Sequence, residues 1–129
     1  SADVLTNRAA RKVTFNVFRQ RIIMPASGKT PNEALIQDTL LEHIPPLLDY
    51  LANQLGSQAY FVGHRCTLAD IAITSQLINF MHAGESINNT QWPTLAAYFE
   101  RMLSQPIWRA LVDREQITLN KMHQAQVVL

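Results

Sequence analysis

The sequence is poor in cysteine, glycine and charge. Among its 129 residues there is one cysteine, Cys66, there are four glycines, and 16% of the residues are charged. A single cysteine excludes an internal disulfide framework and fits a reducing compartment. No apolar run approaches the length of a membrane-spanning helix, and no charged-then-apolar leader opens the sequence. We therefore expect a cytoplasmic protein that does not insert into a membrane.

The composition that remains suits one globular domain. Hydrophobic residues make up 47% of the chain, which is long enough to bury a core. The formal net charge of +1 argues against bulk binding of nucleic acid. Basic residues nevertheless gather in the first 29 positions, against the single acid Asp3: they are Arg8, Arg11, Lys12, Arg19, Arg21 and Lys29. Such a cluster indicates either a solvated helix face or a first helix that faces an anion or a partner.

The first helical pattern covers residues 3–24 and has two apolar stripes. One stripe, at four-residue spacing, consists of Leu5, Ala9, Val13 and Val17. The second stripe, spaced by sevens, fours and threes, consists of Val4, Arg11, Phe15, Phe18 and Ile22. Two stripes predict that this helix packs on two sides. One side would meet its own bundle, and the other a missing domain or a dimer mate.

A second helix is predicted to begin at Thr30. Thr30 is placed to be the N-cap, with Pro31 at the first helical position and Glu33 closing a capping box. The apolar pattern continues in phase beyond Pro45-Pro46, which predicts a kink near His43–Ile44 rather than a stop. The helix should end near Gly56.

The last part of the chain is divided by prolines. Trp92-Pro93 opens one predicted helix, and Gln105-Pro106 ends it and opens another. From Leu119 onward no clear apolar pattern remains, so we expect a frayed tail over residues 119–129. No stretch of the sequence predicts a β-strand.

The central stretch is residues 61–72, Phe-Val-Gly-His-Arg-Cys-Thr-Leu-Ala-Asp-Ile-Ala. Thr67 is placed to cap a helix, and the Asp70 carboxylate can reach back to the Thr67 N–H, as in a capping box with Asp in the usual Glu position. Cys66 and Ile71 stand where a hydrophobic staple would close. The following residues to Phe80 are largely apolar, so we expect this helix to be buried at the centre of the fold.

The sequence holds little catalytic material. His43, His64, His82 and His123 are too scattered for a helix-borne metal pair, and no glycine-rich phosphate loop is present, so we predict no metal site. Cys66 lies just before a helix start, where a thiolate could be stabilised, but free cysteines are typically inert small hydrophobes. The capping role accounts fully for Asp70.

Residues 61–72, together with the Trp-Pro, Glu-Arg-Met and Gln-Pro elements of residues 92–106, resemble the C-terminal all-helical domain of the glutathione S-transferase superfamily, bacterial type. The resemblance covers roughly residues 1–118 and implies an all-α bundle of about five helices. One departure is Cys66, because this staple position usually carries a larger apolar residue.

The resemblance also implies a division of labour. In such transferases a preceding thioredoxin-like domain, absent from this chain, holds most of the glutathione site and the catalytic residue. We therefore expect no catalytic residue within residues 1–129. The inner face of the first helix would line the pocket for the apolar co-substrate through Arg11, Phe15, Phe18 and Ile22, with Arg8 at the rim. The alternative is that Phe15 and Phe18 pack against the missing domain.

The expected function is that of the C-terminal domain of a glutathione transferase-like protein. It would line the co-substrate pocket and the domain and dimer interface of an enzyme that conjugates or reduces hydrophobic electrophiles with glutathione. We expect a homodimer and an isolated chain without activity. The chain would be a piece of a longer protein, with a natural standalone module as the other possibility. A non-catalytic interaction module and a binder of small hydrophobic ligands are the alternative functions.

Overall fold

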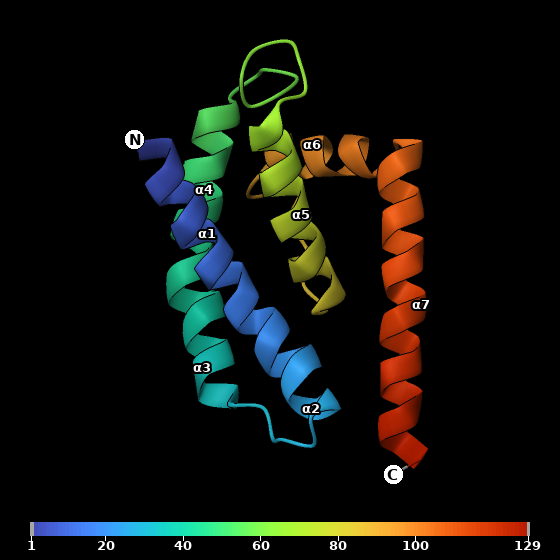
Figure 1. Cartoon of the computed structure of the whole chain (residues 1–129). Coiled ribbons are helices and arrows are strands. Elements are labelled where there is room, and N and C mark those ends of the chain that lie inside the picture. The colour runs from blue at the N-terminus through green and yellow to red at the C-terminus, as the bar shows by residue number, and fades with distance from the viewer. Residues whose placement is uncertain (1, 129) are drawn as a thin grey trace.

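The computed structural model describes residues 2–128, with side chains for residues 10–125. Five helical rods make up the fold, and the described residues contain no strand (Figure 1). The first rod joins α1 (Ala2–Phe18), η1 (Arg19–Ile23) and α2 (Met24–Ala26), and the second joins α3 (Glu33–Asp38), η2 (Thr39–His43) and α4 (Ile44–Leu55). The remaining rods are α5 (Leu68–His82), α6 (Pro93–Leu103) and α7 (Pro106–Val128). The prediction of an all-α bundle of about five helices is confirmed.

Both long rods contain one wide, π-helical turn immediately before a proline. In η1 the Met24 N–H donates to the carbonyl of Arg19, and in η2 the Ile44 N–H donates to the carbonyl of Thr39, in each case five residues back. Such turns are a recognised cause of helix bending. The second rod continues past its proline pair to Leu55, as the apolar pattern predicted, and its irregular turn lies just before the position where we expected a kink.

The second rod begins two residues later than predicted. Its N-cap is Asn32, whose Oδ1 accepts from the Leu35 N–H at 3.0 Å, so the predicted Thr30–Glu33 capping box is wrong. Asn is among the best N-cap residues. A contact that is distant in sequence also holds Asn32 in place, because its N–H donates at 2.8 Å to Oε1 of the buried Gln20 on the first rod.

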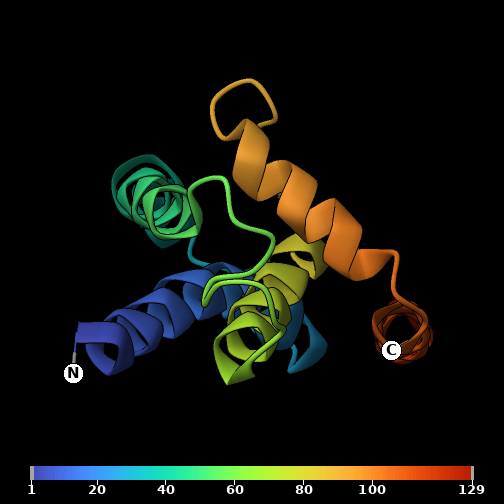
Figure 2. The same ribbon diagram turned by 90° about the horizontal axis from the view of Figure 1, so that it is seen from above.

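The core lies where the two long rods meet α5 and α6. The rod α1 packs along α5, and α4 packs against α6 (Figure 2). The largest fully buried side chains come from each of these rods and include Val17, Ile36, Leu48, Leu55, Leu77, Ile78, Leu95, Tyr98 and Met102. This arrangement places the start of α5 beneath the loop of residues 56–67, which crosses the upper end of the bundle (Figure 1).

The helix α5 is central but is not buried on all sides. Its Asp70, Thr74, Leu77 and Ile78 are buried, whereas Leu68 is 82% exposed and Ile71 is 46% exposed. Cys66 is exposed as well. Both residues of the predicted hydrophobic staple, Cys66 and Ile71, are therefore in contact with solvent. Burial of the exposed apolar side chains of α5 against another surface would therefore be favourable.

The last rod differs from the predicted frayed tail. The helix α7 continues through Leu119 to Val128, because proline stands only at its first position, Pro106, and no glycine interrupts it. The domain boundary after residue 118 remains a prediction. No helix in residues 2–128 is both long and apolar enough to cross a membrane.

Candidate functional site

Asp70 joins three separate segments at the start of α5. The capping box forms: the Thr67 N–H donates to Asp70 Oδ2 at 2.9 Å, and the Thr67 hydroxyl donates to the same oxygen at 3.3 Å. The other carboxylate oxygen, Oδ1, accepts from the Phe61 N–H at 3.0 Å and from the Tyr98 hydroxyl at 2.7 Å. Because Asp70 is fully buried, these donors replace the water that a carboxylate needs.

Aromatic and cationic side chains reinforce this cluster. The Phe61 and Tyr98 rings meet edge to face, with centroids 5.0 Å apart. The Arg101 guanidinium lies 5.6 Å from the Tyr98 ring centre and donates to the carbonyl of Ala59. The loop of residues 56–67 is thereby fixed to both α5 and α6. Tyr98 and Arg101 were not identified from the sequence, because nothing local signals a contact 28 residues away.

The surroundings of Asp70 favour the neutral forms of two neighbouring groups, the Tyr98 phenol and the Cys66 thiol. Burial, and then the hydrogen bond to Asp70, raises the pKa of the Tyr98 phenol far above its ordinary value of 10.0. Partial burial, followed by the nearby negative charge of Asp70, also raises the pKa of the Cys66 thiol above 9.0. Little thiolate is therefore present at neutral pH, which favours the interpretation of Cys66 as an inert residue.

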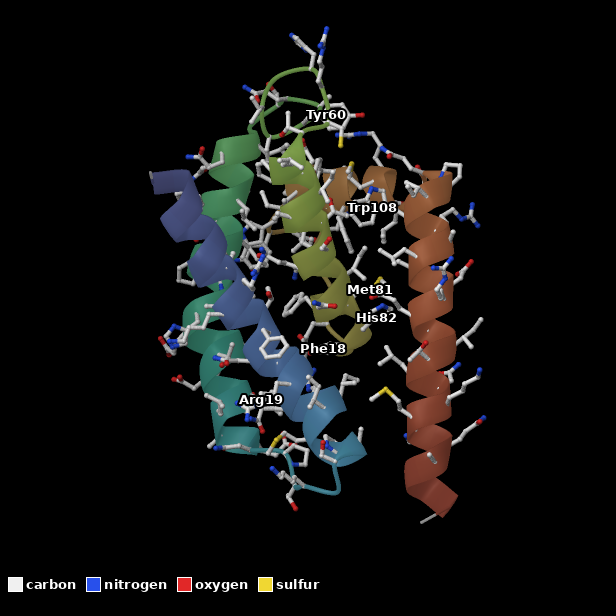
Figure 3. All side chains as sticks on the ribbon, viewed as in Figure 1. Phe18, Arg19, Tyr60, Met81, His82 and Trp108 are labelled. Atoms are coloured by element: carbon white, nitrogen blue, oxygen red, sulfur yellow. The ribbon has the colours of Figure 1, made fainter. Side chains whose placement is uncertain are left out.

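The four predicted substrate-binding residues lie on the first rod, in different environments. Arg11 is exposed, Phe15 is 42% exposed, and Phe18 and Ile22 are partly buried, with Phe18 packed against the core. The rings of Phe15 and Phe18 lie 6.3 Å apart at 32° (Figure 3 labels Phe18). Ile22 belongs to the wide turn η1, so its direction does not follow simple α-helical spacing. The predicted contributions of Val4 and Arg8 lie outside the described side chains.

The basic residues of the first rod fall into two groups. Arg11, Lys12 and Arg19 are exposed, and none of them forms an ion pair within the described part of the chain. Arg21 instead points back to the end of α5, where its Nη1 donates to the carbonyl of Ala83 at 3.0 Å and to Glu85 Oε2 at 2.6 Å. Arg21 therefore closes the C-terminal end of α5, and the other three cations remain open to an external partner.

Exposed apolar side chains complete the candidate site. Phe15 on α1 and both Leu68 and Ile71 on α5 are exposed, and their two helices lie side by side (Figures 1 and 2). Within residues 10–125, no group of three or more His, Cys, Asp or Glu side chains could hold a metal ion. The arrangement can offer apolar contact and positive charge, and the described side chains supply no assembled nucleophile and base.

Comparison with known proteins places this arrangement in a family. The family model described as "Glutathione S-transferase, C-terminal domain" matches residues 14–106, more than half of the chain. A glutathione S-transferase of Arabidopsis thaliana is 33% identical over 93 residues, which are 70% of this chain and 41% of that protein. An elongation factor 1-gamma 3 of Oryza sativa subsp. japonica is 28% identical over 105 residues, covering 81% of this chain and 25% of that protein.

Solved structures add nothing to this comparison, because none of them matches the chain significantly. The chain spans less than half the length of the curated relatives it matches. The family model covers the stretch from the last turn of α1 to the first residue of α7, which carries both the capping box and the Phe15–Phe18 pair. The chain belongs to the glutathione S-transferase C-terminal domain family.

Proposed function

We propose that this domain lines the pocket for a hydrophobic electrophile in a glutathione-dependent, cytoplasmic enzyme whose thioredoxin-like domain lies outside the chain. The observation that carries the proposal is the exposed apolar surface on α1 and α5. Leu68, Ile71 and Phe15 are exposed on two adjacent helices of a chain that covers only 41% of a related transferase. Each Å² of apolar surface buried by a docked domain would contribute roughly 25 cal/mol.

The proposed pocket wall consists of Arg11, Phe15, Phe18 and Ile22. Two tilted phenylalanine rings supply a broad apolar contact at a small cost in side-chain entropy. Arg11 lies one helical turn before Phe15 and has no carboxylate partner among the described residues, so its guanidinium is free to meet an anionic group. Glutathione, bound mainly by the other domain, would supply the nucleophilic thiol. Residues of this chain would orient the electrophile and exclude water from it.

We also propose that the full protein is a homodimer. The first rod presents the exposed cations Lys12 and Arg19, and the adjacent second rod presents the exposed acids Glu33, Asp38 and Glu42. In a two-fold dimer the same surface occurs twice, so the basic rod of one copy can meet the acidic rod of the other. The exposed Leu41 would add apolar contact to that charge complementarity.

The genetic test is the coding sequence upstream of Ser1. A thioredoxin-like segment with a candidate Ser, Cys or Tyr nucleophile is the expected result. A stop codon directly before Ser1 would contradict the enzyme proposal and favour a standalone interaction module. Residues 1–129 alone should not conjugate glutathione to a standard aromatic electrophile.

The kinetic test uses the full-length protein with Phe15→Ala. We expect the KM for the electrophile to rise about tenfold, because a truncated aromatic contact removes a few kcal/mol of binding at most. The KM for glutathione should stay unchanged. Ile107→Ala is the matched control, since Ile107 is a strongly exposed apolar residue on α7. An unchanged KM for the electrophile in Phe15→Ala, or an equal rise in the control, would refute the assignment of the pocket wall.

A further inference from the structure

The helix α7 contacts the rest of the bundle near both of its ends. Two residues, Ser104 and Gln105, connect it to α6, and it stands at the side of the molecule (Figures 1 and 2). Trp108 is buried and Val112 packs against the core, so the upper part of α7 is anchored by apolar contact. Towards its other end, α7 packs against the short α2.

A buried polar contact lies between these two attachments. His82, in the last turn of α5, points towards α7 (Figure 3). Its Nε2 lies 3.3 Å from Glu115 Oε1, and the tautomer with its proton on Nε2 donates to that carboxylate. The His82 side chain is 2% exposed and that of Glu115 is 38% exposed. The other ring nitrogen, Nδ1, is buried without a hydrogen-bond partner among the described residues.

Glu115 interrupts an otherwise apolar seam. Trp108, Val112, Glu115 and Leu119 follow one another at spacings of four, three and four, the pattern of a single helix face. All four are at least partly buried, and the residues between them are exposed. Up to residue 125, the other side-chain hydrogen bonds along α7 are internal, from Gln116 to Asn120 and from Thr118 to the carbonyl of Arg114.

The His82–Glu115 contact both favours and disfavours the position that α7 has in this structure, here called the closed position. With α7 in place, Glu115 satisfies one nitrogen of His82, and the second nitrogen remains unpaired in an environment without solvent, which is unfavourable. If α7 moves away, water can replace Glu115 as the partner of Nε2. Loss of Glu115 would leave the whole imidazole buried and unpaired, so the closed position would then become the less favourable one.

We propose that α7 is a hinged arm, pivoting at Ser104–Gln105, whose closed position depends on the His82–Glu115 hydrogen bond. The apolar contacts of Trp108 and Val112 lie near the pivot and keep the first turns of α7 packed against the core. The hydrogen bond lies nearly three turns from the pivot and about one turn beyond Val112, and it controls the angle of the distal half. The hinged arm involves residues of this chain alone and does not rest on the proposed function.

The test measures distances between two nitroxide spin labels by pulsed electron paramagnetic resonance on the full chain. Because Cys66 is the sole cysteine, Cys66→Ser gives a background for labels at Gln37→Cys on α3 and Lys121→Cys on α7, both exposed. In this background we expect a narrow distance distribution. Glu115→Ala should add a broad population at other distances, whereas Glu115→Gln, which keeps an acceptor oxygen, should remain narrow.

Asp113→Ala is the matched control, because Asp113 is an exposed acid of the same helix without a partner in the described residues. A narrow distribution for Glu115→Ala, or equal broadening in the control, would overturn the proposal. Hydrogen exchange of the unsubstituted chain gives a second result that does not depend on any variant's folding. Amides of residues 113–125 should exchange about tenfold faster than those of α5, through local opening. Equal protection of α5 and α7 would overturn the hinge.

Discussion

Replacing Asp70 with alanine should destabilise the domain more than any surface change. The carboxylate is fully buried and accepts from Thr67 N–H, Thr67 hydroxyl, Phe61 N–H and Tyr98 hydroxyl. Alanine offers no acceptor and is too small to shield these donors. The buried donors would therefore have to remain unpaired, or the loop of residues 56–67 and α6 would have to move until water reached them.

The magnitude follows from the separate contacts. Loss of a helix cap costs about 1 kcal/mol. An unpaired buried donor costs about 1–3 kcal/mol, and both the Tyr98 hydroxyl and the Phe61 N–H would lose their acceptor. With about 2 kcal/mol for the buried Tyr98 hydroxyl and about 1 kcal/mol for the partly buried Phe61 N–H, the sum is about 4 kcal/mol. Since domains have unfolding free energies of about 5–15 kcal/mol, this change would bring the protein close to the limit of folding.

Urea unfolding followed by circular dichroism measures the effect. With an m-value of about 2 kcal/mol per molar urea, the midpoint of Asp70→Ala should fall by about 2 M. Asp38→Ala serves as the control, because Asp38 is exposed and forms only a surface pair with His43, so its midpoint should stay within about 0.3 M. If the two variants had equal midpoints, the account of Asp70 as the joint between three segments would be wrong.

Three further outcomes follow from the same structure. Asn32→Ala should lower the unfolding free energy by about 1 kcal/mol and Thr30→Ala should leave it unchanged, as urea midpoints would show. Because folding raises the pKa of Tyr98, the contribution of the neutral phenol to stability is complete below pH 10.0 and is lost as the pH rises further. Tyr98→Phe should therefore lose less stability at alkaline pH than the unsubstituted protein does. An equal alkaline loss of stability in both proteins would contradict this account. Cys66 should react with iodoacetamide more slowly at pH 7 than a free thiol does, with a rate that still increases above pH 9.0.

Local signals in the sequence were sufficient to predict where most of the helices begin and end. Prolines at the first helical positions predicted the starts of α6 and α7, and Gly56 predicted the end of α4. The Thr67–Asp70 spacing was sufficient for the capping box, because both partners lie within one turn. The resemblance to the transferase family added the arrangement of the helices, which periodicity alone does not determine.

Contacts between distant segments could not be predicted in the same way. Gln20 selects Asn32 as the cap of the second rod, and Tyr98 completes the hydrogen bonds of Asp70, yet no spacing rule connects residues 12 or 28 positions apart. The exposure of Leu68 and Ile71 was also missed, since an apolar sequence does not show which of its faces has no partner within the chain. The residues of the candidate pocket wall stood out as a stripe, but their role came from the resemblance to the transferase family, and the partial burial of Phe18 depends on packing.

The two wide turns have a consequence for how these helices tolerate change. A π-helical turn accommodates one residue more than an α-helical turn while the helix on either side keeps the same face towards the core. Counting across Arg19–Ile23 or Thr39–His43 by 3.6 residues therefore displaces the expected positions of the later residues by about one residue. By the same reasoning, a one-residue deletion inside either turn would restore a regular α-helix and leave both flanking faces where they are. A one-residue deletion in the middle of α1 or α4 would instead rotate one half of the rod by about 100° against its neighbours.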